Sequence, residues 1–152
     1  MVVTLKKVPM FAIGTKNGKG WLNMLESKIV YSAMKTPDGT LIRSRHVHDY
    51  QTHEDAVNGK HYMIDGGLVY VRSSCNGDGE SFTITLEDDH EIVRKYVDWG
   101  TYGKNGDESL HYIKLMDMET GHIEAILETQ KHVHPNLKQA MINELEYRDN
   151  ES

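Results

Sequence analysis

Residues 43–72 read RSRHVHDYQTHEDAVNGKHYMIDGGLVYVR, and most of the predicted sheet structure follows from them. The Asn58-Gly59 dipeptide is a strong signal for a tight turn between antiparallel strands, and β-prone segments flank it on both sides. Gly66-Gly67 interrupts the returning arm, which indicates a bulge or a turn before Leu68 to Arg72 resume as a strand. The stretch therefore predicts a β-hairpin followed by a further short strand.

Another hairpin is predicted just before this stretch. Ile29 to Tyr31 form a β-prone run, Pro37-Asp38-Gly39 supplies a turn, and Thr40 to Ile42 return as the partner strand. Ser81 to Leu86 read SFTITL, in which apolar and polar residues alternate as in a half-buried strand. The first part of the chain is therefore expected to be rich in strands.

Helical spacing replaces this alternation after Leu86. Asp88 and Glu91 resemble a capping box ahead of a helix that we expect to end at Gly100. The later elements are a strand over residues 110–118, a helix from Asp117 or Thr120 that breaks at His134-Pro135, and a last helix from Asn136.

The order of these elements indicates the fold class. Strands gather in the first part and helices in the second, without the regular alternation of a doubly wound sheet. We therefore predict an α+β fold, with antiparallel hairpins first and helices packed on the sheet second. At 152 residues the chain is long enough to bury an ordinary core, and a single domain spanning residues 1–152 is expected.

Composition excludes several classes of protein. The formal charge of −6 disfavours direct binding of nucleic acid, which needs a basic surface. No apolar run approaches the length of a membrane span, and the first residues lack the pattern of a signal peptide. Cys75 is the single cysteine, so no disulfide framework is expected. These features predict an intracellular protein that does not act at a membrane.

Histidines in the central stretch form the best candidate for a metal site. His46 and His48 are two residues apart, so on a strand they would point the same way, and His53 and Glu54 follow closely. A divalent metal held by His46, His48 and His53 would suit a hydrolase that uses Asp49 or Glu54 as its base. Metal-free histidines on a hairpin face are the alternative interpretation.

Two pairs of motifs resemble segments of small accessory proteins of tailed phages. The first pair is Arg-His-x-His-Asp-Tyr at 45–50 and Asp-Gly-Gly-Leu-x-Tyr-x-Arg at 65–72. The second is Trp-Gly-Thr at 99–101 and His-Ile at 122–123. The resemblance covers a little over half of the chain. It implies a small protein that acts in the cytoplasm of an infected bacterium, where it blocks a host factor or sequesters a small molecule.

We therefore expect a non-enzymatic binding protein without a cofactor, with the metal-dependent hydrolase as the alternative. Its partner is expected to be a host bacterial protein or a nucleotide-like small molecule, and self-association is left open. Mixed basic and aromatic groups would hold an anion or an acidic protein surface. The residues expected to form this site are Arg43, Arg45, His48 and Asp49 on the hairpin and Tyr102, Lys104 and Asn105 in the glycine-rich loop.

Overall fold

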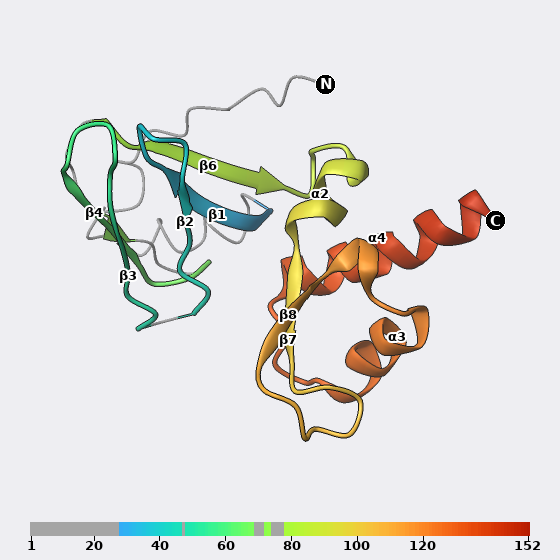
Figure 1. The fold of residues 1–152 in the computed structure, drawn as a ribbon. Coiled ribbons are helices and arrows are strands. Elements are labelled where there is room, and N and C mark those ends of the chain that lie inside the picture. Colours follow the sequence, from blue (N-terminus) through green and yellow to red (C-terminus); the bar gives the residue numbers. More distant parts are fainter. Residues whose placement is uncertain (1–27, 47, 69–71, 74–77) are drawn as a thin grey trace, which may run out of the picture. The chain divides into compact units, whose positions relative to one another are not determined.

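The computed structural model describes residues 28–46, 48–68, 72–73 and 78–152 (Figure 1). The fold is α+β, as predicted, with most strands in the first part and the longer helices in the second. Contacts within the chain divide it into two compact units, Met1–Thr83 and Ile84–Ser152. That the chain forms a single domain spanning residues 1–152 stays a prediction. Cys75, the single cysteine, lies outside the described residues.

Unit 1 contains the first predicted hairpin. Strand β1 (Ile29–Lys35) pairs antiparallel with β2 (Leu41–Ile42), and β6 (Glu80–Thr85) completes a sheet of order β2-β1-β6. The turn contains Gly39, whose φ of 86° lies in the region that glycine adopts without strain. The predicted turn at residues 37–39 and the strand over 81–86 are thus confirmed.

The second hairpin of unit 1 forms around Asn58-Gly59. Strand β3 (Gln51–Glu54) pairs antiparallel with β4 (His61–Asp65), which pairs in turn with β5 (Arg72–Ser73). Gly66 and Gly67 both have positive φ, so the interruption predicted between β4 and the next strand is present. Residues 69–71 of that expected strand lie outside the described residues.

The core of unit 1 joins the two hairpins. Met34 and Ile42 come from the β1–β2 hairpin, whereas Tyr62 and Ile64 come from β4, and the four side chains form one buried cluster. Removal of such apolar surface from water contributes about 25 cal/mol for each Å² buried. The cluster therefore explains why the alternating residues of β4 face inward.

Unit 2 combines one small hairpin with helices. Its elements are α2 (His90–Tyr96), β7 (Asp98–Thr101), β8 (His111–Lys114), the 3-10 helix η2 (Leu115–Asp117), α3 (Thr120–Thr129) and α4 (Pro135–Glu151). The buried apolar residues include Val93 and Val97 after the start of α2, Leu115 of η2, and Ile123 and Ile126 of α3. The helices were predicted from the helical spacing of Val93 and Val97 and of Ile123 and Ile126, whereas Leu115 was expected in a strand over residues 110–118, of which only His111–Lys114 is strand.

Helix α2 differs from its prediction at both ends. Its N-cap is Asp89, whose side chain accepts from the Glu91 amide, whereas Asp88 accepts from the Thr85 amide at 2.8 Å. The helix ends at Tyr96 and not at Gly100, because Val97 is extended and its carbonyl accepts from the Leu115 amide at 2.8 Å. Pairing with a distant strand thus overrides the local helical pattern.

Helix α4 begins where the sequence predicts a break. Pro135 occupies the first turn, where its missing N–H costs nothing, and His134 caps the helix by accepting from the Asn136 amide through Nδ1 at 3.1 Å. No helix in the described part of the chain is both long enough and apolar enough to cross a bilayer.

Candidate functional site

The β7–β8 hairpin carries an exposed apolar face. Gly100 and Tyr112 are paired across the two strands, so they belong to the same face of the sheet. A Cβ atom at position 100 would lie 3.0 Å from Cε1 of Tyr112 and 3.3 Å from Cδ1 of Leu110. The tyrosine and the leucine therefore lie against the backbone of Gly100, and a side chain at this position would displace them.

Three side chains of this hairpin remain open to solvent. Tyr102 is 57% exposed, Leu110 48% and Tyr112 42%. We call these three residues the tyrosine face. A single exposed apolar residue is ordinary on a protein surface, whereas several on one short hairpin mark a candidate contact surface.

A defined turn carries the other residues predicted in this region. Gly103 and Gly106 have φ values of 85° and 72°, and the Gly106 amide donates to the Gly103 carbonyl at 3.1 Å. Lys104 and Asn105 lie between these glycines and are exposed. The amide of Glu108 closes the loop by donating to the Tyr102 carbonyl at 2.8 Å. The structure therefore brings Tyr102, Lys104 and Asn105 together in one ordered loop.

The other predicted group lies in a loop of unit 1. Arg43 places its guanidinium carbon 4.4 Å from the centre of the Tyr31 ring, and the Arg45 amide donates to Asp49 Oδ2 at 2.8 Å. His48 is exposed and has a φ of 70°. These residues share one loop, but that loop belongs to a different compact unit from Tyr102, Lys104 and Asn105.

Hydrogen bonds hold the Asp49 carboxylate of this loop. Burial acts to raise the pKa of its carboxyl group, but the hydrogen bonds from the Arg45 amide and the Gln51 side chain outweigh burial, and the pKa is lowered. Asp49 is therefore held as an anion that orders its own loop. Whether the neighbouring arginines hold a ligand stays a prediction.

The predicted metal site of His46, His48 and His53 assumes that the first two histidines lie on a strand, and this assumption is wrong. His46 and His48 lie in the loop between β2 and β3 and not on a strand, so the alternation of a strand does not orient them alike. His53 does lie on β3, but its Nε2 atom is 2.7 Å from Oδ2 of Asp38. The structure thus gives His53 a carboxylate partner that sequence reasoning did not pair with it.

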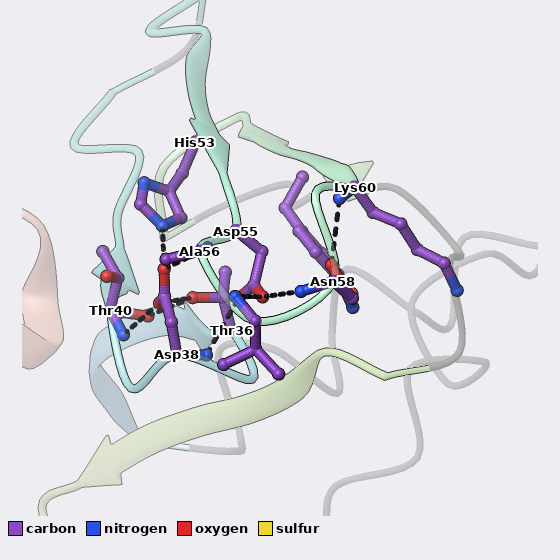
Figure 2. A network of polar contacts seen from close by, with 10 residues as sticks. Thr36, Asp38, Thr40, His53, Asp55, Ala56, Asn58 and Lys60 are labelled. Carbon is purple, nitrogen blue, oxygen red and sulfur yellow. Dashed lines mark hydrogen bonds and ion pairs between the residues drawn. The ribbon is translucent and has the colours of Figure 1, made fainter.

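Figure 2 shows the network around Asp38. Oδ2 of Asp38 contacts His53 and accepts from the Ala56 amide at 3.0 Å, whereas Oδ1 accepts from Thr36 Oγ1 at 2.6 Å and from the Thr40 amide at 3.0 Å. The hydrogen bonds from Thr36 and Ala56 lower the pKa of the Asp38 carboxyl group far below its usual value. Asp38 therefore fastens the β1–β2 turn to the β3–β4 hairpin.

Asp55 completes this network from the other turn. Its Oδ2 accepts from the Asp38 amide at 2.8 Å, and its Oδ1 accepts from the amides of Val57 and Asn58 at 2.8 and 3.0 Å. Asp38, His53 and Asp55 each offer a ligand atom within 4.8 Å of the others. However, both oxygens of Asp38 already have two hydrogen-bond partners each, so a metal ion bound by Asp38 would have to displace at least one of them. The network is a structural link between turns.

Unit 2 holds a second charged cluster that the sequence did not reveal. Glu144 of α4 is fully buried, and it contacts Arg94 Nη2 at 2.7 Å, Arg148 Nε at 2.7 Å and His90 Nε2 at 2.7 Å. Burial acts to raise the pKa of the Glu144 carboxyl group, but hydrogen bonds from Arg94, Arg148 and His90 outweigh it, and the pKa is lowered. The cluster joins α2 to α4, since Glu144 and Arg94 are fifty residues apart in the chain.

Comparison with protein-family models, with curated proteins and with solved structures gives no match. The resemblance to phage accessory proteins therefore stays a prediction from the quoted motifs.

Proposed function

We propose that this protein is a non-enzymatic binding protein whose partner docks on the tyrosine face. The observation that carries the proposal is the exposure of Tyr102, Leu110 and Tyr112 on one hairpin, where Leu110 and Tyr112 lie against the bare backbone of Gly100. Tyrosine is enriched at protein interfaces because its ring supplies contact area at a low entropic cost and its hydroxyl still forms hydrogen bonds. An ordered turn holds the loop, so little ordering is needed on binding.

The charge of unit 2 indicates the chemistry of the partner. Between residues 84 and 152 acidic side chains outnumber basic ones by more than two to one. Asp107 and Glu108 are exposed in the same loop as the tyrosine face, and Asp117 and Glu119 are exposed just beyond β8. A partner surface with an apolar patch and a rim of lysine and arginine would complement this arrangement and associate faster at low salt. This favours a basic protein over the anionic ligand or acidic surface expected from the sequence.

The polar clusters support a binding role more than a catalytic one. A general base must reach a substrate proton with an available lone pair. The oxygens of Asp38, Asp55 and Glu144 are instead used in hydrogen bonds that join elements of the fold. If the resemblance to phage proteins holds, the partner is a host bacterial protein in the cytoplasm, and the effect of binding is inhibition.

A pull-down with matched variants tests the proposal. The tagged full chain is compared with Tyr102→Ser/Tyr112→Ser and with Tyr50→Ser/Val57→Ser, in which the replaced residues of unit 1 are 59% and 71% exposed. We expect a protein captured from bacterial lysate by the wild type and the unit 1 variant, and a loss of roughly 10- to 100-fold in affinity for the hairpin variant.

Two results would overturn the assignment. Equal capture by all three proteins would show that the tyrosine face makes no contact, and loss only in the unit 1 variant would move the site to the loop of Arg43 and Arg45. Sedimentation of the purified chain separates a further outcome, because a concentration-dependent dimer that Tyr112→Ser abolishes would identify the partner as a second copy. Circular dichroism of each variant confirms that the fold is retained.

A further inference from the structure

Two Asn-Gly pairs lie within the described residues, and they occupy comparable positions. Asn58-Gly59 forms the turn of the β3–β4 hairpin, and Asn105-Gly106 forms the turn in the β7–β8 loop. All four residues are exposed, and both glycines have positive φ, of 67° and 72°. The pairs at Asn17 and Asn76 lie outside the described residues. Exposure and backbone conformation therefore do not distinguish the two described pairs.

Asparagine before glycine is open to a reaction within the chain. The glycine amide nitrogen attacks Cγ of the asparagine, the new C–N bond closes a succinimide ring, and the side-chain nitrogen leaves as ammonia. Water then opens the ring to aspartate or isoaspartate, so that no other reactant is consumed. Glycine permits the attack because it has no Cβ to obstruct its own nitrogen. The rate in a folded chain depends on how freely the carboxamide can turn toward that nitrogen.

The carboxamide of Asn58 is held at both ends. Its Nδ2 donates to the Tyr62 hydroxyl at 3.0 Å, and its Oδ1 accepts from the Lys60 amide at 2.9 Å. The attacking nitrogen is also engaged, because the Gly59 amide donates to the Asp55 carbonyl at 2.8 Å. Since Tyr62 is fully buried in the core, its hydroxyl is a fixed partner for the carboxamide. Rotation of the Asn58 side chain thus breaks two hydrogen bonds before any reaction begins.

The carboxamide of Asn105 has no such restraint. Within the described part of the chain it forms no hydrogen bond, and the Gly106 amide makes only the 3.1 Å bond to the Gly103 carbonyl. We propose that Asn105 is a site of spontaneous deamidation, and that the fold protects Asn58 from the same reaction. Two hydrogen bonds of ordinary strength correspond to roughly a 10- to 100-fold difference in rate.

The reaction would change the loop that also carries Tyr102. A neutral carboxamide becomes a carboxylate between Lys104 and the exposed Asp107, and isoaspartate adds a methylene to the backbone of the turn. The assignment of Asn105 does not depend on the proposed function, because it rests on the hydrogen bonds of the two asparagines alone.

Site-resolved peptide mapping tests the inference. The full chain is incubated in mildly alkaline buffer, sampled over time and digested, and mass spectrometry measures aspartate plus isoaspartate at each asparagine. In the folded protein we expect Asn105 to react roughly 10- to 100-fold faster than Asn58. In concentrated urea, where neither carboxamide is held, the two rates should become similar.

Comparable rates at the two sites in the folded protein would overturn the inference, and so would a ratio that urea leaves unchanged. Tyr62→Phe supplies an independent check because it removes the acceptor of the Asn58 carboxamide and retains the buried ring. It should accelerate deamidation at Asn58 and leave Asn105 unaffected. Equal acceleration at both sites would instead indicate general loosening of the fold and contradict the role given to the Tyr62 hydroxyl.

Discussion

The ends of the β3–β4 and β7–β8 hairpins use the same turn dipeptide in different ways. At the first, Asp55 accepts three amide hydrogen bonds and the Asn58 carboxamide is fixed at both ends. At the second, the backbone of the loop is ordered, but Tyr102 and Asn105 extend into solvent. The polar side chains of the β3–β4 turn are thus used to stabilise the fold. The β7–β8 loop has an ordered backbone and exposed side chains, which suits it for contact with a partner.

Replacement of Asp55 should remove most of the difference between the two turns. We expect it to lower stability more than any of the changes that follow. Asp55→Ala leaves the amides of Asp38, Val57 and Asn58 without their acceptor, at a position where the side chain is 1% exposed. We expect the thermal midpoint to fall by roughly 5–15 °C. Differential scanning calorimetry measures the shift, and Asp107→Ala in the β7–β8 loop is the matched control, with no appreciable change expected.

Acid should loosen the same turn by protonating its carboxylates. In the folded chain the pKa of the Asp38 carboxyl group is lowered, mainly by hydrogen bonds from Thr36 and Ala56. Burial acts to raise the pKa of the Asp55 carboxyl group, but hydrogen bonds from backbone amides outweigh burial, and this pKa is lowered as well. The unfolded chain therefore binds more protons in acid, and the stabilisation present above the unfolded pKa of about 4 is lost as pH falls toward the folded values.

Urea unfolding across acid pH measures this effect. The wild type should lose stability below about pH 4 more steeply than Asp38→Asn, which has one carboxylate fewer to protonate. Parallel pH profiles for the two proteins would show that Asp38 contributes nothing to the acid dependence.

Gly100→Ala tests the open hairpin directly. The added Cβ would stand 3.0 Å from Cε1 of Tyr112, so the ring must move. Because Tyr112 is 42% exposed, it can shift into solvent, and we expect a modest loss of stability of about 1 kcal/mol together with weaker partner binding. Denaturant unfolding and the pull-down measure the two effects. Unchanged binding would mean that the position of the Tyr112 ring does not affect contact with the partner.

Metal ions should have the smallest effect. Since the oxygens of Asp38 and Asp55 already accept hydrogen bonds, neither Zn²⁺ nor Mn²⁺ nor a chelator is expected to move the thermal midpoint. A ligand that binds the folded state raises the midpoint by mass action. A rise with metal that Asp38→Asn abolishes would therefore restore the metal site and the hydrolase alternative.

Local signals account for what the sequence predicted correctly. The turn at Asn58-Gly59 and the helical spacing of Ile123 and Ile126 each depend on residues close in the chain. The helix that carries the two isoleucines ends at Thr129, however, before the break predicted at His134-Pro135. The same holds for Tyr102, Lys104 and Asn105, which a single glycine-rich loop brings together.

Distant partners account for what the sequence missed. The sequence predicts the end of a helix where β7 lies, because the pairing of Trp99 with Ile113 has no local signal. The contact between His53 and Asp38 spans fifteen residues and joins two separate turns. Aspartates next to turn glycines commonly accept amide hydrogen bonds, so the role of Asp38 had a recognisable signal, whereas the choice of His53 as its partner had none.

Glu144 has a consequence for how α4 is positioned along its own axis. The helix buries few apolar side chains, among them Ala140 and Met141, and such small contacts would tolerate sliding. A carboxylate gripped by Arg94 of another helix does not, because one residue of slippage moves it by about 1.5 Å and breaks both contacts. The buried ion pairs therefore favour a single register of α4 along its axis.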